Sequence, residues 1–532
     1  MNIEFLGRVA LISNYSQIEE EFLKSHLSWG DLSYRIPLEV VPYGLIPVTE
    51  RIDNSIRVSN ARPKKVTLML AKLSDGRLYT LKHALIFILN KFGKEINYDV
   101  SSLPVEELDK LGTIDPEYLP GITFRDYQEK TINKALAFGS GIIMSAVGSG
   151  KTEMQIAISG FMIDNNISEY VLVICPSLAL VENFYSRCKK YGITNVQRFQ
   201  SGGHIDPSKQ IIVANINPVR NQLARNGKYS DLLKKCSTLI VDEAHHLRAD
   251  TFYQVAVTIN PKHLYEFSGT PFQNNNYYSN YQDFLVYSLG GRIVSSVPTS
   301  YLISLGYLAQ PYFMMLPIGK QHRVFEKNFG TVYTRYIVKN KERNNAILEW
   351  AKMLFKYKMK ILILVQRMEH MDILIELLSK NNEDANIIGV RGSSMGRSYD
   401  FKVNSVVEFP VSYDSIFSRF RNGEFDIVIA SGIADEGVDI NSIDCLLICS
   451  GQKSFIKTTQ RAGRGLRKKS GLNEVYILDF MDNSHPYLKK HSILRHDHYN
   501  SVGAIELTPQ KFIDRVYQNF LTRNSENEDE KS

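Results

Sequence analysis

Three arginines at three-residue spacing stand beside two glycines late in the chain. The stretch QRAGRGLRK at residues 460–468 carries Arg461, Arg464 and Arg467. Charges at this spacing are typical of an exposed helix face, which is one interpretation. Glycine is unfavourable inside a helix, however, and two of them favour a turn at which the backbone approaches another group closely. Because planar guanidinium donors beside such a turn suit the oxygens of a phosphate, a phosphate-binding loop is expected elsewhere in the chain.

The stretch SAVGSGKT at residues 145–152 has the composition of such a loop. It follows an apolar run that predicts a strand and precedes EMQIAISGFMI, which predicts a helix, the order of elements that the loop requires. Loop N–H groups would bind phosphate oxygens, the lysine would neutralise the β- and γ-phosphates, and the threonine hydroxyl would bind Mg²⁺. Ser145 departs from the pattern, which usually has glycine there. The predicted phosphate-binding residues are Gly148, Ser149, Gly150, Lys151 and Thr152, of which Thr152 is also a predicted metal ligand.

Two adjacent carboxylates follow a further predicted strand, in LIVDEAHH at residues 239–246. The carboxyl end of a strand is where an α/β sheet presents residues to ligands. We therefore expect Asp242 to hold Mg²⁺ through water and Glu243 to polarise the water that attacks a γ-phosphate. Such a pair can also be the N-cap and acidic first turn of a helix, but the upstream loop favours the catalytic interpretation.

The composition indicates a globular protein. Of 532 residues, 44% are hydrophobic and 22% charged, and the net charge of +7 permits a nucleic-acid partner without requiring one. The five cysteines form no C-x-x-C pair and no zinc-type cluster with histidine, so we expect reduced thiols in the core. The start MNIEFLGRVA lacks a basic leader, and no apolar run is long enough to cross a bilayer. We expect a soluble cytoplasmic protein with no membrane partner.

Two regions of the chain alternate apolar strands with helical segments. The first runs from about residue 121 to 310 and includes YVLVICP and QIIVANI, and the second begins near residue 360 and includes KILILVQ and FDIVIAS. Continuous apolar strands with crossover helices predict parallel sheets that are covered on both faces. The predicted fold class is therefore α/β, with two tandem parallel-sheet lobes and a small mixed α+β N-terminal domain.

The predicted domains follow this pattern. They are an accessory domain at 1–115, a nucleotide-binding first lobe at 116–310, a second lobe at 311–490, and a C-terminal helix with an acidic, disordered tail at 491–532. Thr508 as N-cap and Pro509 at the first helical position predict the start of the C-terminal helix. The residues expected to dock this helix on a lobe are Phe512, Val516 and Phe520.

The order of the motifs resembles that of superfamily 2 helicases over residues 121–485. The motifs that carry the resemblance are FRDYQ (124–128), SAVGSGKT (145–152), CPSLALVENF (175–184), DEAH (242–245), SGTP (268–271), ASGIADEGVDI (430–440) and QRAGRGLR (460–467). Three further stretches, LISLGYLAQPYF, KERNNAI and VYILDFMD, resemble the XPB-like and phage UvsW-like DEAH-box branch, which acts on branched DNA. The resemblance implies two RecA-like lobes, ATP and Mg²⁺ as cofactors and, for a phage protein, a location in the host cytoplasm.

The resemblance also implies which residues bind the nucleotide outside the loop. Gln128, with Arg125 nearby, would read the adenine, because an amide can both donate to and accept from a base edge. An ordinary surface turn is the alternative for this pair. Gly437 and Asp439 would approach the nucleotide from the second lobe.

A further group of residues would connect the nucleotide to movement. By resemblance, His245 and residues 268–270 would couple the phosphate state to the nucleic-acid surface. Arg464 and Arg467 would reach the γ-phosphate as arginine fingers, and Arg461 would pair with acidic groups. The predicted catalytic set is Lys151, Asp242, Glu243, His245, Gln460, Arg464 and Arg467.

Each lobe is expected to hold a nucleic-acid backbone. Polar side chains and N–H groups that directly follow strands suit phosphates, and such contacts do not depend on base sequence. Asn215 and Ser431 stand where the family commonly has threonine, and both retain the ability to hydrogen bond. The predicted contacts are Pro176, Ser177, Gly202, Gly203, Asn215, Gln366, Arg367 and Ser431.

The segment between NIIGVRG and FDIVIAS is longer than one crossover helix requires. Its alternating first half predicts a β-hairpin within residues 392–410 that carries Arg397, Tyr399, Phe401 and Lys402. One interpretation is a wedge that splits strands, in which Tyr399 and Phe401 stack on unpaired bases. The other is a surface ribbon that packs on its own lobe.

These observations lead to a functional prediction and its alternatives. We expect a monomeric, ATP-hydrolysing DNA helicase or translocase that unwinds or branch-migrates forked and junction DNA in replication, recombination or repair, with residues 1–115 recognising the substrate. The same core motifs also suit a DEAH-type RNA helicase or transcript-release factor, with RNA as the partner. A nucleotide-switched DNA clamp is a third class, against which the complete hydrolytic set argues. A restriction-type motor subunit is a fourth, although no nuclease-like cluster is evident in the flanks.

Overall fold

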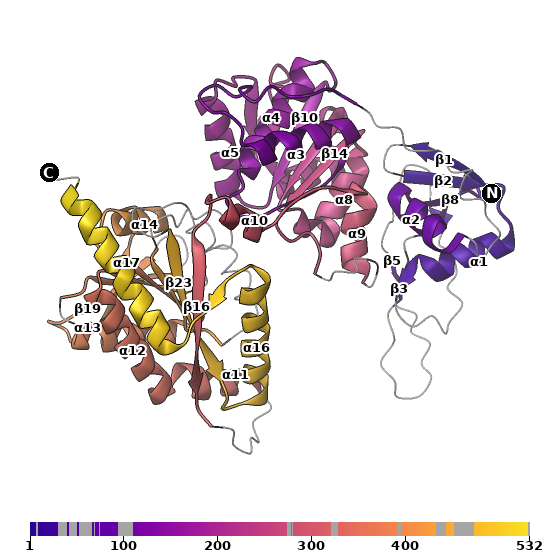
Figure 1. Cartoon of the computed structure of the whole chain (residues 1–532). Coiled ribbons are helices and arrows are strands. Elements are labelled where there is room, and N and C mark those ends of the chain that lie inside the picture. The colour runs from indigo at the N-terminus through magenta and orange to yellow at the C-terminus, as the bar shows by residue number, and fades with distance from the viewer. Residues whose placement is uncertain are drawn as a thin grey trace, which may run out of the picture. The chain divides into compact units, whose positions relative to one another are not determined.

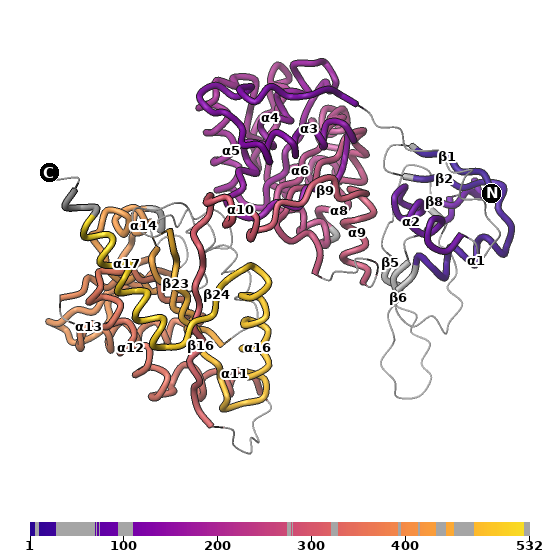
Figure 2. Tube along the Cα trace, in the orientation of Figure 1, coloured from indigo at the N-terminus to yellow at the C-terminus, as the bar shows by residue number. Residues whose placement is uncertain are grey.

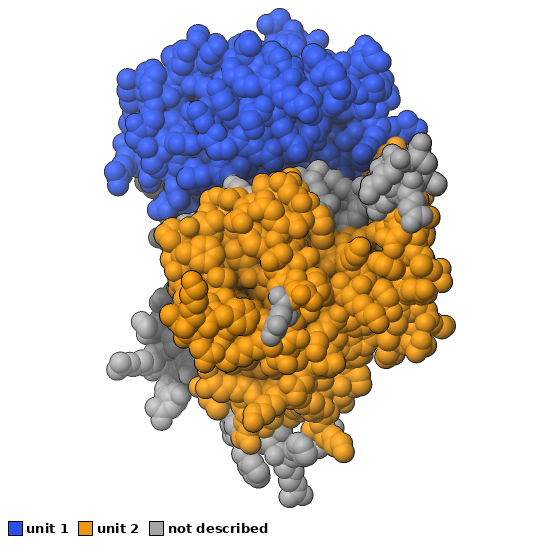
Figure 3. Space-filling view, turned by 90° about the vertical axis from the view of Figure 1, so that its left-hand side faces the viewer, with its two compact units in different colours: residues 1–297 blue, residues 298–532 orange. Residues whose placement is uncertain are grey.

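The computed structural model divides into two compact units, residues 1–297 and 298–532, which Figure 3 colours separately. Figures 1 and 2 trace the elements of each unit. In the part of the chain that is described, no helix combines the length and apolarity that a bilayer span requires. The structure describes residues 1–6, 9–29, 40–41, 50–52, 66–68, 70–73, 75–93, 110–273, 278, 280–320, 328–382, 384–391, 395–431, 443–451 and 473–529.

Unit 1 begins with a small mixed sheet and two helices. Among its described residues, five strands pair in the order β1-β2-β8-β7-β4, antiparallel except for the parallel pair of β4 and β7. The elements are β1 (Asn2–Leu6), β2 (Val9–Ser13), α1 (Gln17–His26), β4 (Val40–Val41), β7 (Ala71–Leu73), β8 (Leu78–Leu81) and α2 (Lys82–Phe92). A separate sheet contains β3 (Ser28–Trp29), β5 (Glu50–Ile52) and β6 (Val66–Leu68). The predicted mixed α+β character of this region is confirmed.

The rest of unit 1 is a parallel sheet covered by helices on both faces. Its described strands follow the order β11-β12-β10-β13-β14-β9-β15, and every described pair is parallel. The strands are β9 (Gly141–Ser145), β10 (Tyr170–Cys175), β11 (Val196–Phe199), β12 (Ile211–Asn215), β13 (Cys236–Asp242), β14 (His263–Ser268) and β15 (Ile293–Val297). The helices are α3 (Asp126–Phe138), α4 (Lys151–Asp164), α5 (Leu178–Lys190), α6 (Ile216–Ala224), α7 (Ser230–Lys234), the 3-10 helix η3 (Ala244–Arg248), α8 (Asp250–Ile259) and α9 (Tyr281–Gly290).

Strand β10 illustrates why these strands are continuously apolar. Val171 and Val173 lie in one core together with residues of α4 and α5, whereas Leu172 and Ile174 lie in a second core together with residues of α6, α8 and α9. Both faces of the sheet are therefore buried, as the sequence predicted.

The N-terminal sheet shares the second of these cores with α8 and α9. The Phe87 ring of α2 lies 5.4 Å from the Phe284 ring and 5.5 Å from the Tyr287 ring of α9. Gly291, which directly follows α9, is packed against the His83 imidazole, because a Cβ at Gly291 would lie 2.6 Å from that ring. The small domain is thus packed on the first lobe through α2 and α9.

Unit 2 is a second α/β lobe. Its described strands follow the order β20-β19-β18-β21-β17-β22-β23-β16-β24, and they pair in parallel except for β18 with β19 and β19 with β20. The strands are β16 (Gln310–Ile318), β17 (Ile361–Val365), β18 (Ile387–Arg391), β19 (Met395–Asp400), β20 (Ser405–Pro410), β21 (Ile427–Ser431), β22 (Cys445–Ile448), β23 (Glu474–Asp482) and β24 (Ile505–Glu506). The helices are α10 (Thr299–Ser304), α11 (Phe329–Tyr333), the π-helix η5 (Thr334–Val338), α12 (Lys341–Lys356), α13 (Met368–Asn381), α14 (Tyr413–Arg421), α16 (Pro486–Ser501) and α17 (Pro509–Asp529). The predicted α/β class with two parallel-sheet lobes is confirmed.

The C-terminal helix α17 packs on this lobe. Phe512 and Val516 are fully buried in the core that contains α12 and α13, and the partly buried Phe520 lies with its ring 5.8 Å from that of Tyr357. The helix continues through Asp529, so residues 525–529, which the sequence predicted as disordered, are helical. The acidic run does not end the helix, because α17 is already nucleated by its packed first half.

A fully buried arginine fixes the edge of the second sheet at the carboxyl ends of its strands. Arg343 of α12 donates to the carboxylate of Asp482 and, at 3.3 Å, to the carbonyl oxygen of Cys449. Its guanidinium carbon also lies 4.1 Å from the centre of the Phe480 ring. The ends of β22 and β23 are therefore joined through one side chain.

Candidate active site

Two glycines with left-handed backbone shape the loop between β9 and α4. Gly148 has a φ of 84° and Gly150 a φ of 81°. A Cβ at Gly150 would lie 2.1 Å from Nε2 of Gln128, so only glycine fits there without moving that side chain. The buried Ser145 hydroxyl donates to the Ser149 hydroxyl at 2.6 Å, and this bond braces the loop at the position where the usual pattern has glycine.

Lys151, the first residue of α4, is held close to Glu243. Its Nζ lies 3.3 Å from Glu243 Oε1 and donates to the carbonyl oxygen of Ser145 at 3.3 Å. The two side chains of the ion pair are only 12% and 15% exposed. Glu243 has a φ of 51°, a conformation that is uncommon for a residue other than glycine and that recurs at functional sites. The cation and the carboxylate that the sequence predicted as catalytic are thus brought together.

Asp242, the last residue of β13, contacts α4 directly. Its Oδ1 accepts a hydrogen bond of 2.8 Å from Nε2 of Gln155. Thr152 precedes Gln155 by three residues, so both side chains leave the same face of α4. The carboxylate and the threonine hydroxyl are oxygen ligands of the kind that Mg²⁺ prefers.

His245 connects the carboxylates to the loop after β14. Its Nδ1 lies 3.3 Å from the Ser268 hydroxyl and 3.4 Å from Glu243 Oε2. The same hydroxyl accepts a hydrogen bond of 3.2 Å from the Thr270 N–H. The structure therefore brings His245 and the loop at 268–270 into one hydrogen-bonded group.

Gln128 and Arg125 lie at the start of α3, beside the phosphate-binding loop. The Gln128 side chain accepts from the Arg125 N–H at 3.0 Å and donates to the Ser149 carbonyl at 2.9 Å. Tyr127 donates to the same carbonyl at 2.9 Å and accepts from Arg125 Nη1 at 3.0 Å. Gln128 thus supports the loop in this structure, and its reading of an adenine stays a prediction.

The loop and its neighbours fit a nucleoside triphosphate with Mg²⁺. The positive φ values of Gly148 and Gly150 shape the loop, and α4 begins directly after Gly150. The N–H groups at the N-terminus of a helix suit phosphate oxygens. Lys151 supplies a cation, and Thr152 and Asp242 supply oxygen ligands. When bound, the nucleotide would supply the phosphoanhydride that is cleaved and Mg²⁺ would neutralise its charge.

The predicted nucleic-acid contacts of the first lobe lie at one edge of its sheet. Cys175 of β10 pairs with Asn215 of β12, so the carboxyl ends of these strands are level. Asn215 Nδ2 donates to the Pro176 carbonyl at 2.8 Å. The Ser177 hydroxyl accepts from the Leu180 N–H at 3.3 Å as the N-cap of α5. Ser177 therefore caps the N-terminus of α5, and Asn215 connects the start of α6 to Pro176, which precedes α5.

Gly202 and Gly203 lie at the same edge, three and four residues after β11. Phe199 of β11 pairs with Ala214 of β12, next to Asn215. Gly202 has a φ of 75°, and the Gly203 N–H donates to the Gln200 carbonyl at 2.9 Å in a tight turn. Both glycines are exposed, as a contact with a phosphate backbone requires.

The predicted contacts of the second lobe lie at the carboxyl ends of β17 and β21. Val365 pairs with Ser431, so Gln366 and Arg367 lie beside Ser431 at the carboxyl ends of these strands. Arg367 already has protein partners, since it donates to the Thr334 hydroxyl and, at 3.2 Å, to the Gly330 carbonyl. The Ser431 hydroxyl lies 3.1 Å from the Met368 sulfur.

The structure does not place Tyr399 and Phe401 beside the other predicted nucleic-acid contacts of the second lobe. Strand β19 runs antiparallel to β18, with Met395 opposite Arg391 at the carboxyl end of β18. The hairpin turn at residues 401–404 therefore lies at the opposite edge of the sheet, about 20 Å along β19 from Met395. Tyr399 is buried and bonded to Asn404, whereas Phe401 is 62% exposed.

Several predicted residues lie outside the described part of the chain. They are Gly437 and Asp439 of the predicted nucleotide contacts, and Gln460, Arg461, Arg464 and Arg467 of the arginine-rich stretch. Their roles stay predictions.

Sequence reasoning missed Gln155 and Asp283. Asp283, at the start of α9, is fully buried, lies 3.0 Å from Arg248 Nε and accepts from the Gln273 N–H at 2.9 Å. It thereby joins η3 to the loop after β14. The only sequence signal for Gln155 is an amide among apolar residues, three positions after Thr152.

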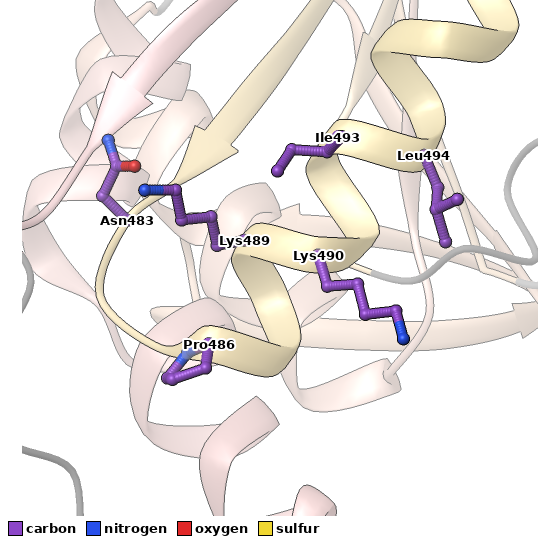
Figure 4. Close-up of a pocket in the computed structure, with 6 residues that line it drawn as sticks. All are labelled: Asn483, Pro486, Lys489, Lys490, Ile493 and Leu494. Carbon is purple, nitrogen blue, oxygen red and sulfur yellow. The ribbon is translucent and has the colours of Figure 1, made fainter.

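A surface pocket on the second lobe contains none of the predicted residues. It has a volume of about 410 Å³ and lies along α16. Figure 4 shows its six lining residues, which are Asn483, Pro486, Lys489, Lys490, Ile493 and Leu494.

Two family models match the chain. The model described as "Type III restriction enzyme, res subunit" matches residues 121–273. The model described as "Helicase conserved C-terminal domain" matches residues 343–469. Together the matches cover slightly more than half of the chain and include the loop, both carboxylates and the arginine-rich stretch.

Similar proteins are found among curated relatives and solved structures. The DNA 3'-5' translocase XPB2 of Sulfurisphaera tokodaii is 23% identical over 374 residues, which cover 65% of this chain and 79% of the relative. The crystal structure of T4 UvsW aligns with 95% of this chain and 98% of that chain, at 15% identity and a TM-score of 0.41. S. cerevisiae Dbp5 bound to RNA and ADP BeF3 aligns with 77% of this chain and 100% of that chain, at 15% identity and a TM-score of 0.50. At this identity, the likeness to Dbp5 shows the fold alone.

Proposed function

Because the chain belongs to the superfamily 2 helicases, which are ATP-dependent helicases and translocases, we propose that it unwinds or branch-migrates forked and junction DNA in replication, recombination or repair. Membership confirms the predicted resemblance and makes the protein an ATP hydrolase that acts with nucleic acid. The DNA substrate and the roles of individual residues go beyond what membership of the family gives, and they are the content of the proposal.

The observation that carries the proposal is the pairing of α4 with the end of β13. Lys151 lies 3.3 Å from Glu243, and Gln155 donates to Asp242 at 2.8 Å. One helix N-terminus therefore holds both members of a carboxylate pair that can bind a metal and accept a proton. A protein that only binds nucleotide as a switch needs no such proton acceptor, so this pairing supports hydrolysis.

We assign the chemical steps to individual side chains. Lys151 would bind the β- and γ-phosphate oxygens, and Thr152 and Asp242 would hold Mg²⁺. Glu243 would orient the attacking water and accept its proton. Through its contact with Ser268, His245 would couple the state of the bound phosphates to the loop after β14.

DNA is the proposed partner because of one relative. XPB2, of which this chain covers 79%, is described as a DNA translocase. The net charge of +7 permits a polyanionic partner and does not distinguish DNA from RNA. The contacts that follow the strands would hold the DNA backbone independently of its sequence, through Ser177, Gly202, Asn215, Gln366 and Ser431 among others.

The hairpin is a proposed second contact with DNA. At its turn, Phe401 is 62% and Val403 59% exposed. The strand that leads into the turn is anchored, because Arg397 is paired with Asp372 of α13 at 2.7 Å and Tyr399 is buried. An exposed aromatic ring on an anchored support suits stacking on an unpaired base.

The hairpin proposal is tested by removing the ring alone. Phe401→Ala should reduce strand displacement while leaving DNA-stimulated ATP hydrolysis intact. Val403→Ala is the matched control, because it removes exposed apolar surface without an aromatic ring. Equal strand displacement by Phe401→Ala and the wild type would contradict the wedge interpretation.

The substrate proposal is tested by ATP hydrolysis with no nucleic acid, single-stranded DNA, duplex DNA, a four-way junction and structured RNA, each at two salt concentrations. We expect the greatest stimulation by the junction, and less stimulation at the higher salt concentration, because backbone contacts release counterions. If RNA stimulates ATP hydrolysis and DNA does not, the DNA proposal is wrong, and the protein is an RNA helicase or transcript-release factor.

A further inference from the structure

Gln155 is a polar side chain in the most buried stretch of α4. It is 1% exposed, and its neighbours Met154, Ile156, Ala157 and Ile158 are fully buried. An amide in such a place is unfavourable unless both its donor and its acceptor groups find partners. The partners of Gln155 therefore indicate why an amide is present.

The donor side of the amide has a clear partner. Nε2 lies 2.8 Å from Oδ1 of Asp242. Because an ionised carboxylate can only accept, the NH₂ group of Gln155 must face Asp242 and its carbonyl oxygen must point elsewhere. The contact fixes one oxygen of the carboxylate and so restricts the rotation of Asp242.

The acceptor side of the amide is unsatisfied. Oε1 of Gln155 is buried and has no hydrogen-bond partner within the described ranges of the chain. A buried carbonyl oxygen without a donor is rare in native proteins, and an ion or water at the site is a common explanation. An apolar side chain of similar length would avoid this cost if Gln155 served packing alone.

We propose that Gln155 is a positioning residue for the metal of the nucleotide site, through both ends of its amide. Nε2 orients Asp242, and Oε1 accepts a hydrogen bond from a water in the shell of Mg²⁺. This inference rests on the proposed function, since Thr152 and Asp242 are its metal ligands. Mg²⁺ keeps several of its waters in protein sites, and each such water is a donor. Groups that orient ligands in this way set metal affinity without touching the ion.

A binding experiment separates this role from packing. The affinity of the full-length protein for a fluorescent, non-hydrolysable ATP analogue is measured across a MgCl₂ titration and in excess EDTA. For Gln155→Met, which keeps the length of the side chain but forms no such bonds, we expect the Mg²⁺ concentration at half-maximal binding to rise about 10-fold. The affinity in EDTA should equal that of the wild type.

Two further variants control the experiment. Ser159→Ala removes a buried hydroxyl one turn further along α4, which donates only to the Gln155 carbonyl of the helix backbone at 2.8 Å, and should leave both affinities unchanged. Gln155→Asn retains an amide in the buried site, so it serves if Gln155→Met does not fold. Its amide is one methylene too short to reach both partners, and we expect a shift in the same direction.

The possible results of this experiment distinguish a failure of the role of Gln155 from a failure of the proposed function. A wild-type Mg²⁺ dependence in the folded Gln155 variants, or an equal loss of affinity with and without Mg²⁺, would overturn the role of Gln155. Absence of Mg²⁺-dependent nucleotide binding in the wild type would instead overturn the proposed function itself.

Discussion

Lys151 Nζ and Glu243 Oε1 lie 3.3 Å apart, and the ion pair joins the N-terminus of α4 to the residue that follows β13. In this arrangement Lys151 neutralises the carboxylate that would act as the base. If Lys151 binds phosphate instead, it no longer neutralises Glu243, which can then accept a proton from water. The pair would thus link nucleotide binding at the loop to activation of Glu243 as the proposed base.

Replacing the base should stop hydrolysis without preventing binding. For Glu243→Gln we expect phosphate release to fall by about 10²–10⁴-fold, because an amide cannot accept the proton. Binding of a fluorescent ATP analogue should persist. Glu182→Gln, at an exposed glutamate of α5 that pairs with Arg198, is the matched control and should hydrolyse ATP normally. Phosphate release by Glu243→Gln within a few-fold of the wild type would exclude Glu243 as the base.

Short sequence motifs were sufficient to predict the loop and the two carboxylates. A phosphate-binding loop depends on consecutive residues, so GSGKT and DEAH indicate their own chemistry. The contact between Gln155 and Asp242 joins residues 87 positions apart and depends on how α4 is rotated against the sheet. No short sequence pattern predicts how α4 is rotated against the sheet.

Gly150→Ala should damage the loop selectively. The new Cβ would lie 2.1 Å from Gln128 Nε2, in addition to the strain of a positive φ. We expect kcat/KM for ATP to fall by about 10²-fold, as for other small displacements of binding groups. Gly121→Ala is the matched control, because its φ is 82° and nothing lies within 4 Å of the new Cβ. A similar loss of activity in both variants would show that strain, and not the contact with Gln128, is responsible.

The second lobe should lose stability as the pH falls below about 6.5. His370 Nε2 lies 3.0 Å from Asn344 Oδ1, and its Nδ1 is buried with no hydrogen-bond partner in the described ranges. Burial, assisted by the Arg343 charge, lowers the pKa of His370 from 6.5 to about 3. The neutral form therefore stabilises the fold fully above pH 6.5, and this contribution is lost progressively as the pH falls towards 3.

Urea unfolding at several pH values measures this effect. His370→Gln, which can still donate to Asn344, should reduce the loss of unfolding free energy between pH 6.5 and 5. Some loss should remain, since burial also lowers the pKa of His498 to about 4. The exposed His204 offers the control His204→Gln. An identical pH profile for wild type and His370→Gln would contradict the prediction.

Gly291→Ala should loosen the N-terminal domain from the first lobe. The new Cβ would lie within 2.8 Å of three atoms of the His83 ring, which overpacks the contact between α2 and α9. We expect faster proteolytic release of a fragment that contains α2. Gly192→Ala has a comparable φ of 73° and open space around its Cβ, so it reports strain alone. Equal rates of release for the two variants would show that this contact does not hold the domain.

The position of the hairpin turn illustrates what pattern cannot supply. Alternation of polar and apolar residues predicts a hairpin around Tyr399, and the structure contains one. The edge at which Phe401 lies depends on the antiparallel pairing of β19 with β18, in which Arg397 is opposite Gly389. That pairing joins separate strands of the sheet. The alternation of polar and apolar residues would be the same if Phe401 lay at the other edge.

The central claim, movement along DNA driven by hydrolysis, is tested most directly by displacement of a third strand from a DNA triplex. We predict displacement with ATP and Mg²⁺, none with a non-hydrolysable analogue, and none by Glu243→Gln. ATP hydrolysis stimulated by duplex DNA with no displacement, on this substrate and on forks, would contradict the account and support a nucleotide-switched clamp.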